Sequence, residues 1–217
     1  MYVPPAFRED RPEVLRAAIR ATRLAILVSA GPDGPIASHV PLMLDETDGP
    51  DTAKGGGTLL GHLARANPQW RVSAGTVPAL AIFPGPDAYI SPAWYATKRE
   101  TGKVVPTWNY VAVHATGPIE FFDDPDALLA LVTRLTARHE SGRPSPWKVT
   151  DAPPDFIASQ LKGIVGFRLA ITRLEGKWKM SQNRPMPDRV GVIEGLEREG
   201  TPDAAAVADA VSSTLAG

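Results

Sequence analysis

The chain has 217 residues, of which 43% are hydrophobic and 22% charged, and these values are ordinary for a soluble globular protein. Its formal net charge of −1 indicates no overall basic field for nucleic acid or an anionic membrane. The sequence has no cysteine, which excludes disulfides, thiolate catalysis and cysteine-ligated metal centres. No apolar run approaches the roughly 18 residues that span a bilayer, and the first residues lack the pattern of a secretory signal. We therefore expect a cytoplasmic protein without a membrane segment.

Short strand patterns separated by turns fill the first half of the chain. Asp10 and Pro12 are residues that cap and begin a helix, so the first predicted element is helical. In chain order we predict a helix at 9–22, strands at 23–30 and 35–44 joined by a turn at 31–34, a flexible loop at 45–57, a strand at 58–63 with a helical turn at 64–70, and strands at 79–85 and 88–95.

The second half holds the longest strand pattern and most of the predicted helix. After Thr107 side chains alternate between two faces, with Val111 and Val113 on one and Tyr110 and His114 on the other. In chain order we predict a mobile polar segment at 96–106, a strand at 107–123, helices at 124–140 and 153–163, a strand pair or one strand bent at Gly176 over 164–180, and helices at 187–199 and 201–214. The last helix is rich in alanine, so we expect it to pack loosely.

The organisation of these elements favours a β-rich fold. The 22 prolines and 19 glycines indicate many turns between short elements, and neither an internal repeat nor a domain boundary is evident. Strands dominate, and helices are inserted between them. We therefore predict an α+β fold, mainly β, in which one closed antiparallel barrel carries peripheral helices. This single domain would cover residues 1–217, with a helical extension from about residue 186.

The stretch "GKWKMSQNRP", residues 176–185, combines cations with hydrogen-bonding side chains. In a strand, Lys177, Lys179, Ser181 and Asn183 would share one face, which suits a phosphate, while Trp178 and Met180 would share an apolar face. The alternative is a solvated edge strand guarded by lysines. That alternative explains the lysines, but it does not explain the consecutive polar residues from Ser181 to Arg184.

A second candidate is "GHLARANPQW", where a strand ends at Gly61 and a helical turn begins. Free backbone N–H groups at such a turn can point at an anion. His62 and Arg65 are three residues apart and therefore lie on one helical face. This pattern suits a phosphate site, and equally a helix cap beside a solvated arginine.

The third candidate is "TWNY", which places Trp108 and Tyr110 on one strand face and Thr107 and Asn109 on the other. Aromatic rings beside amide donors suit a flat heteroaromatic ligand. The alternative, aromatic residues that pack the barrel, is the more common arrangement. The histidines lack the spacing of metal ligands, so we expect no metal site, and no nucleotide-binding glycine loop is present.

Several segments taken together resemble the PaiB-like family of FMN-binding negative transcriptional regulators. They are "MYVPPAF", "ASHVPL", "GHLARANPQW", "YISPAWY", "VPTWNYVAVHATG" and "KGIVGFRLAITRLEGKWKMSQNRP", and the resemblance runs from residue 1 to about residue 195. It implies the split β-barrel fold of pyridoxamine-phosphate oxidases and flavin reductases. It also implies a homodimer with FMN in the groove between subunits.

The resemblance implies cofactor contacts at three of these segments. Arg65 would bind the FMN phosphate with His62 as helper, Asn67 belongs to the same segment, and Trp108 and Asn109 would reach the partner's flavin with Tyr110 beside the ring. The residues assigned to the cofactor groove from the last segment are Lys179, Ser181, Gln182, Asn183 and Arg184.

Two classes of function remain open from the sequence. In the first, the protein is a flavin-binding dimer with a redox, carrier or sensor role, and no side chain marks an obligatory catalytic acid or base, so whether it is an FMN-dependent oxidoreductase is undecided. In the second, it is a DNA-binding repressor with flavin as effector, supported only by modest basic clusters at 97–103 and 173–189. A haem-binding split barrel is a third alternative.

Overall fold

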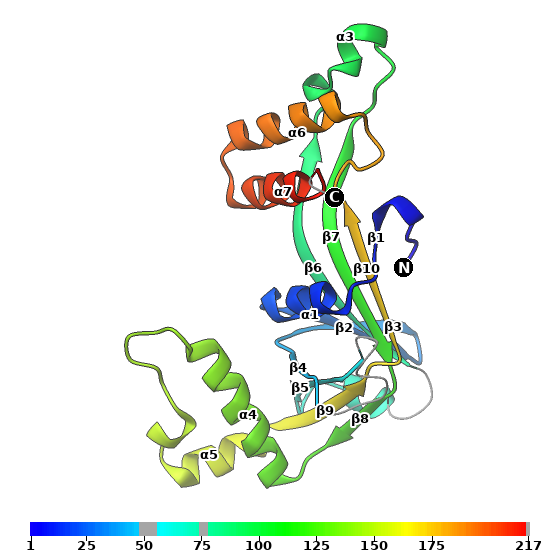
Figure 1. Ribbon diagram of the computed structural model, residues 1–217. Coiled ribbons are helices and arrows are strands. Elements are labelled where there is room, and N and C mark those ends of the chain that lie inside the picture. Colours follow the sequence, from blue (N-terminus) through cyan, green and yellow to red (C-terminus); the bar gives the residue numbers. More distant parts are fainter. Residues whose placement is uncertain (48–55, 74–77, 216–217) are drawn as a thin grey trace. The chain divides into compact units, whose positions relative to one another are not determined.

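The computed structural model describes residues 1–47, 56–73 and 78–215, and it divides the chain into two compact units (Figure 1). The first unit comprises Met1–Leu15, Pro84–Val113 and Glu175–Gly217, and the second comprises Arg16–Phe83 and His114–Leu174. Each unit is therefore assembled from segments far apart in the sequence, which explains why composition shows no boundary. The single domain with a helical extension stays a prediction, and the predicted loop at 45–57 lies mostly outside the described residues.

The strands of the first unit follow the order β1-β10-β7-β6. This unit also contains short 3-10 helices, the short helix α3 and the longer helices α6 and α7. The bounds are η1 Pro5–Phe7, β1 Arg8–Glu9, β6 Ala79–Ile90, η3 Pro92–Trp94, α3 Thr97–Thr101, β7 Thr107–Gly117, β10 Arg173–Lys179, α6 Met186–Glu199 and α7 Pro202–Ser213, with β6, β7 and β10 also contributing residues to the second unit.

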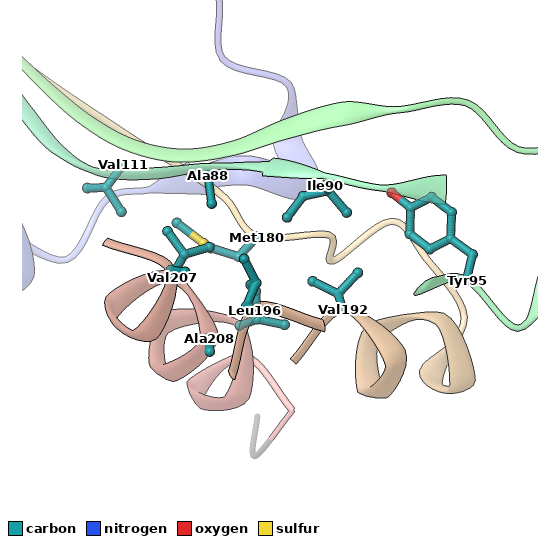
Figure 2. Close-up of a cluster of buried hydrophobic side chains, with 11 residues drawn as sticks. Ala88, Ile90, Tyr95, Val111, Met180, Val192, Leu196, Val207 and Ala208 are labelled. Carbon is teal, nitrogen blue, oxygen red and sulfur yellow. The ribbon is translucent and has the colours of Figure 1, made fainter. Parts of the chain in front are cut away.

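Helices α6 and α7 cover one face of these strands and form the core of the first unit (Figure 1). Figure 2 shows Met180 between the strand residues Ala88 and Val111 and the helix residues Leu196 and Val207. Helix α7 buries four side chains at the spacing of one helical face, namely Ala204, Val207, Ala208 and Val211. The expectation that this alanine-rich helix packs loosely is wrong, because these four residues are buried in the core of the first unit.

Two glycines of α6 seat the η3 turn directly on the helix. A Cβ atom at Gly191 would lie 2.0 Å from the Trp94 carbonyl oxygen, and one at Gly195 would lie 2.2 Å from the Trp94 ring. No larger residue fits at either position without a shift of the turn. The contact fixes η3, and with it the next residue, Tyr95, which is 1% exposed.

The second unit is built on an antiparallel sheet of order β4-β5-β9-β8 and on the hairpin of β2 and β3. Strand β2 also pairs with residues Leu80–Ile82 of β6. Helices α4 and α5 follow β8 in the chain. The bounds are α1 Pro12–Ala21 (which begins in the first unit), β2 Ala25–Gly31, β3 Gly34–Val40, β4 Met43–Asp45, β5 Thr58–Ala64, α2 Gln69–Val72, β8 Ile119–Phe122, α4 Pro125–Glu140, η4 Val149–Asp151, α5 Pro154–Leu161 and β9 Ile164–Ala170.

The predicted α+β arrangement with antiparallel strands is confirmed, and the differences lie at strand boundaries. The predicted strand at 107–123 is interrupted at Pro118. Strand β6 joins the strand predicted at 79–85 to the start of the one predicted at 88–95, but it ends at Ile90, and η3 replaces the rest of the second prediction. Of the two alternatives predicted for 164–180, the structure has two strands, β9 and β10, and not one strand bent at Gly176, because β10 runs through that residue. Gly176 instead permits the close approach of β1, because a Cβ there would lie 2.8 Å from the Glu9 carbonyl oxygen. Within the described ranges, no helix combines the length and apolar character needed to cross a bilayer.

Candidate functional site

A small polar pocket of about 110 Å³ lies in the first unit, where β7 begins and β10 ends. Most of its lining comes from the two segments that the sequence singled out around "TWNY" and "KMSQNR". The lining residues are Tyr95, Val105, Pro106, Thr107, Asn109, Lys179, Ser181, Asn183 and Arg184. Five residues assigned to the cofactor, from Asn109 to Arg184, are thus brought together.

The turn that follows β10 carries three of the lining residues and is braced by Gln182. The Gln182 side chain accepts from the Met180 backbone N–H at 2.7 Å and donates to the Trp178 carbonyl at 2.6 Å. Ser181 has a φ of 60°, in the left-handed region that serine rarely occupies. The strand alternation expected here therefore ends at β10, and Ser181 and Asn183 reach the pocket through a turn instead.

Ser181 is held by Asn109, which is fully buried. The Asn109 side-chain amide donates to the Ser181 hydroxyl at 3.0 Å, and this hydroxyl donates to Asn109 Oδ1 at 3.2 Å. A buried amide is stable only when such partners are present. Asn109 thus gives the turn a fixed position against β7, and its contribution to the pocket is structural as well as polar.

Lys179 is the central cation of the pocket. Its ammonium donates to the Thr107 hydroxyl and, at 2.5 Å, to the Trp108 carbonyl. Burial, and then the charges of Lys177 and Arg184, lower the pKa of Lys179. Among the described lining residues, no carboxylate offsets these cations. The electrostatics therefore favour an anion in the pocket, because an anion would relieve the repulsion between like charges.

Arg184 and Tyr95 form the wall of the pocket beside α6. The Arg184 guanidinium lies 4.5 Å from the centroid of the Tyr95 ring, in the range of a cation–π contact. Burial raises the pKa of Tyr95, so its hydroxyl is neutral near pH 7. Tyr95, in the segment "YISPAWY", was not among the residues predicted to bind the cofactor. The signal that could have found it is its position directly after a proline-containing turn, where the chain direction is fixed.

The aromatic residues of "TWNY" lie on the strand face opposite the core. Trp108 is 54% exposed and contacts Tyr89 edge to face, with ring centroids 6.0 Å apart, whereas Asn109 is buried. Tyr110 is half-buried, and the ammonium of Lys177 lies 5.0 Å from its ring centroid. The predicted separation of faces is confirmed. The exposure of Trp108 rules out the alternative in which this ring packs the core.

The residues predicted from "GHLARANPQW" belong to the second unit and do not line this pocket. Arg65 Nε donates to the Lys162 carbonyl at 2.8 Å, and Nη2 donates to the Ile164 carbonyl at 3.1 Å. Nη1 contacts the Asp123 carboxylate at 3.3 Å. These contacts join the end of β5 to the turn between α5 and β9. His62 is partly buried, and its Nδ1 finds no hydrogen-bond partner in the described part of the chain.

Asn67 takes part in a network that fixes the α2 turn. Its amide donates to the Ser38 hydroxyl at 2.9 Å, and its Oδ1 accepts from the Gln69 backbone N–H at 2.9 Å. The fully buried Gln69 in turn accepts from Ser38 at 2.6 Å and donates to Ser29 at 2.9 Å. The residues Asn67 and Gln69 therefore have an evident structural role in tying this turn to the β2–β3 hairpin.

A larger cavity of about 510 Å³ lies in the second unit between α4, η4 and α5. Its inner wall is apolar, with Leu128, Ile157 and Leu161 among its residues, and Arg65 and Asp123 lie at its edge. The side-chain N–H groups of Arg65 already bond the Lys162 and Ile164 carbonyls and contact Asp123. This cavity is therefore less suited to binding an anion than the polar pocket is.

Comparisons with known proteins agree with the fold and with the cofactor class. A family model described as "Putative FMN-binding domain" matches residues 1–173. An uncharacterised protein of Aspergillus fumigatus is 38% identical over 241 residues, which cover 93% of this chain and 92% of that protein. The Bacillus subtilis "Protease synthase and sporulation protein PAI 2" is 33% identical over 215 residues, which cover 99% of this chain and 98% of that protein.

Solved structures show the same fold at low sequence identity. The FAD and haem binding protein of Mycobacterium smegmatis has a TM-score of 0.57 and 17% identity, with 79% of this chain and 73% of that chain covered. The flavocytochrome Anf3 of Azotobacter vinelandii has a TM-score of 0.56 and 14% identity, with 79% and 69% covered. The predicted split β-barrel fold is thereby confirmed.

Proposed function

The chain belongs to the FMN-binding domain family, and from this premise we propose that the polar pocket of its first unit holds the phosphate of FMN. The resemblance to PaiB-like proteins and the expectation of FMN as cofactor are confirmed. The family match ends at residue 173, so the turn after β10 must be judged from its geometry.

The observation that carries the proposal is the donor set of the pocket. Lys179 and Arg184 supply two cations, and Thr107 and Asn183 supply neutral hydrogen-bonding groups, while Ser181 is held by Asn109. A phosphate monoester carries nearly two negative charges at neutral pH and offers three acceptor oxygens. The side chains present match such a group in charge and in hydrogen-bonding character.

The size of the pocket limits what it can enclose. A cavity of about 110 Å³ is smaller than the roughly 300–1,000 Å³ that encloses a whole drug-sized ligand. We therefore assign the pocket to the phosphate end, with the isoalloxazine ring outside it. Trp108 faces the other side of β7 from Thr107 and Asn109, so its exposed ring would stack on the flavin of a second subunit, as the family resemblance implies.

We further propose a homodimeric, cytoplasmic flavoprotein with a redox or sensor role, in which bound flavin supplies the electron-transfer chemistry. Val105 and Trp108 are 64% and 54% exposed beside the pocket, which supports a second subunit that covers the ring. Haem is the second candidate ligand, because the Mycobacterium smegmatis neighbour binds both FAD and haem by its name. Direct binding of DNA stays a prediction from the family resemblance.

Titration with FMN and with riboflavin, followed by flavin fluorescence, tests the assignment of the phosphate. Riboflavin lacks the phosphate, so wild type should bind FMN more tightly. Lys179→Met should weaken FMN roughly 10- to 100-fold, the loss expected for a charged hydrogen bond, and should leave riboflavin unchanged. Lys98→Met, which changes an exposed lysine of the same unit, is the matched control.

Equal affinity of wild type for FMN and riboflavin would place the phosphate outside this pocket. The absorbance spectrum of the purified protein separates flavin from haem in the same samples, since haem gives a Soret band. Sedimentation of the protein with and without FMN measures the proposed dimer.

A further inference from the structure

Tyr95 has a buried hydroxyl whose hydrogen finds no acceptor in the described part of the first unit. The side chain is 1% exposed, and its ring lies at one end of the apolar cluster of α6 and α7 (Figure 2). Its oxygen meets no partner at hydrogen-bond geometry among the residues that the structure describes, and the nearby Arg184 guanidinium can only donate to it, so the hydroxyl hydrogen has no acceptor there. A buried hydroxyl without a partner is unfavourable, and a phenylalanine would fill the same space without that cost.

The position of this hydroxyl-bearing residue indicates what it could bind. Tyr95 lines the same pocket as Lys179 and Arg184, and the Arg184 guanidinium lies over its ring. The turn opposite carries Ser181 at a φ of 60°. Strained backbone of this kind is found at ligand sites, where the surroundings hold it in place.

We propose that Tyr95 determines specificity in this pocket by donating its hydroxyl hydrogen to the terminal phosphate monoester of the ligand. This inference rests on the proposed function and adds a residue and a selectivity to it. A terminal phosphate has three oxygens free to accept, whereas the diphosphate of a dinucleotide continues into a second nucleoside. A pocket of about 110 Å³ has no room for that continuation.

The charged groups around Tyr95 agree with its role as a donor. Burial raises its pKa, Arg184 acts in the opposite direction, and Asp188 and Tyr89 add to the increase. The hydroxyl therefore keeps its proton throughout the neutral range and can donate to a dianion. Asp188 is the competing acceptor, since it is fully buried and its Oδ2 also lacks a partner within the described ranges.

The competition between ligand and Asp188 can be decided with Tyr95→Phe, which removes one oxygen atom. If the hydroxyl serves the ligand, the ligand-free variant should melt at the same temperature as wild type or higher. Its affinity for FMN should fall roughly tenfold, and its affinity for riboflavin should stay the same. Tyr2→Phe is the matched control, because Tyr2 is an exposed tyrosine of the same unit and does not line the pocket.

Each alternative result is distinct. A lower melting temperature of ligand-free Tyr95→Phe would show that the hydroxyl bonds within the protein. Unchanged FMN affinity would show that the hydroxyl does not reach the phosphate. Either result overturns the inference.

A titration with inorganic phosphate separates this inference from the proposed function. If wild type is stabilised by phosphate but not by FMN, and Tyr95→Phe loses that stabilisation, the inference stands while the proposed function fails. If neither ligand stabilises wild type, both fail.

Discussion

Asn109 and Ser181 are 72 positions apart in the chain and bond each other through two side-chain contacts, at 3.0 and 3.2 Å. Both residues are buried, and they join the start of β7 to the turn after β10. All the cationic residues of the pocket belong to that turn or to the end of β10. The pair therefore sets the distance between the two walls of the candidate phosphate site.

Replacement of Ser181 by alanine should destabilise the protein by about 1–3 kcal/mol, because the buried Asn109 amide loses its partner. Alanine at a φ of 60° is strained much as serine is, so the change isolates the hydrogen bond. Chemical denaturation measures the free energy of unfolding. Ser213→Ala is the control, since Ser213 is exposed and its hydroxyl donates to the Asp209 carbonyl one turn earlier in the same helix. Equal stability of the Ser181 and Ser213 variants would show that Asn109 is satisfied in another way.

As the pH rises into the alkaline range, FMN affinity should begin to decrease at a lower pH than it would if a lysine with the usual pKa bound the phosphate. Lys179 binds phosphate as a cation, and its pKa is lowered from the usual 10.5 by burial and by the neighbouring cations. Affinity should therefore be constant while Lys179 is protonated and should fall as the pH rises through that lowered pKa. Lys179→Arg should keep its charge and lose this decline. A wild-type profile that is flat to the ordinary lysine pKa, measured by fluorescence titration, would contradict the role of Lys179.

Arg65→Ala should lower stability and leave the preference for FMN over riboflavin unchanged. The Arg65 side chain bonds two backbone carbonyls, at Lys162 and Ile164, so its loss should cost about 1–3 kcal/mol. Arg143→Ala is the control, because Arg143 is an exposed arginine of the same unit whose described ion pair is local, with Glu140. A tenfold weaker binding of FMN alone in Arg65→Ala would support the phosphate assignment made from the sequence.

The sequence was most informative where the argument was local. The alternation at 107–111 predicted that Trp108 and Asn109 face opposite sides, because strand geometry fixes that pattern between neighbours. The helix predicted at 124–140 also follows from a local pattern, and α4 runs from Pro125 to Glu140 with Asp124 as its cap. Such features need no knowledge of distant segments.

Distant contacts account for what the sequence missed. The role of Arg65 depends on carbonyls about 100 positions later, which no pattern around residue 65 records. The position of Tyr95 depends on Gly191 and Gly195, which accept the η3 turn against α6. The presence of glycine at position 176 suggested a bend. The structure shows instead that glycine is needed there because β1 lies too close for a Cβ atom. The segments that form the candidate site could therefore be located from the sequence. The sequence did not show which of their side chains are available to a ligand and which hold the protein structure in place.

His62 should make the protein less stable in mild acid. Its pKa is lowered by burial, so the unfolded chain, with a histidine pKa near 6.5, binds a proton more readily than the folded protein. The stability contributed by neutral His62 is complete above about pH 6.5 and is lost as the pH falls below it, by at most about 1.4 kcal/mol per pH unit, until the folded-state pKa is reached.

Unfolding free energies at about pH 7.5 and about pH 5.5 measure this effect when wild type is compared with His62→Gln. The variant should lose less stability than wild type between the two values, because glutamine does not titrate. His39→Gln is the matched control, since His39 is exposed on β3 and its removal should leave the wild-type difference intact. If both variants lost as much stability as wild type between the two pH values, the acid sensitivity would have to come from groups other than His62. The burial of His62 would then have no measurable effect on stability.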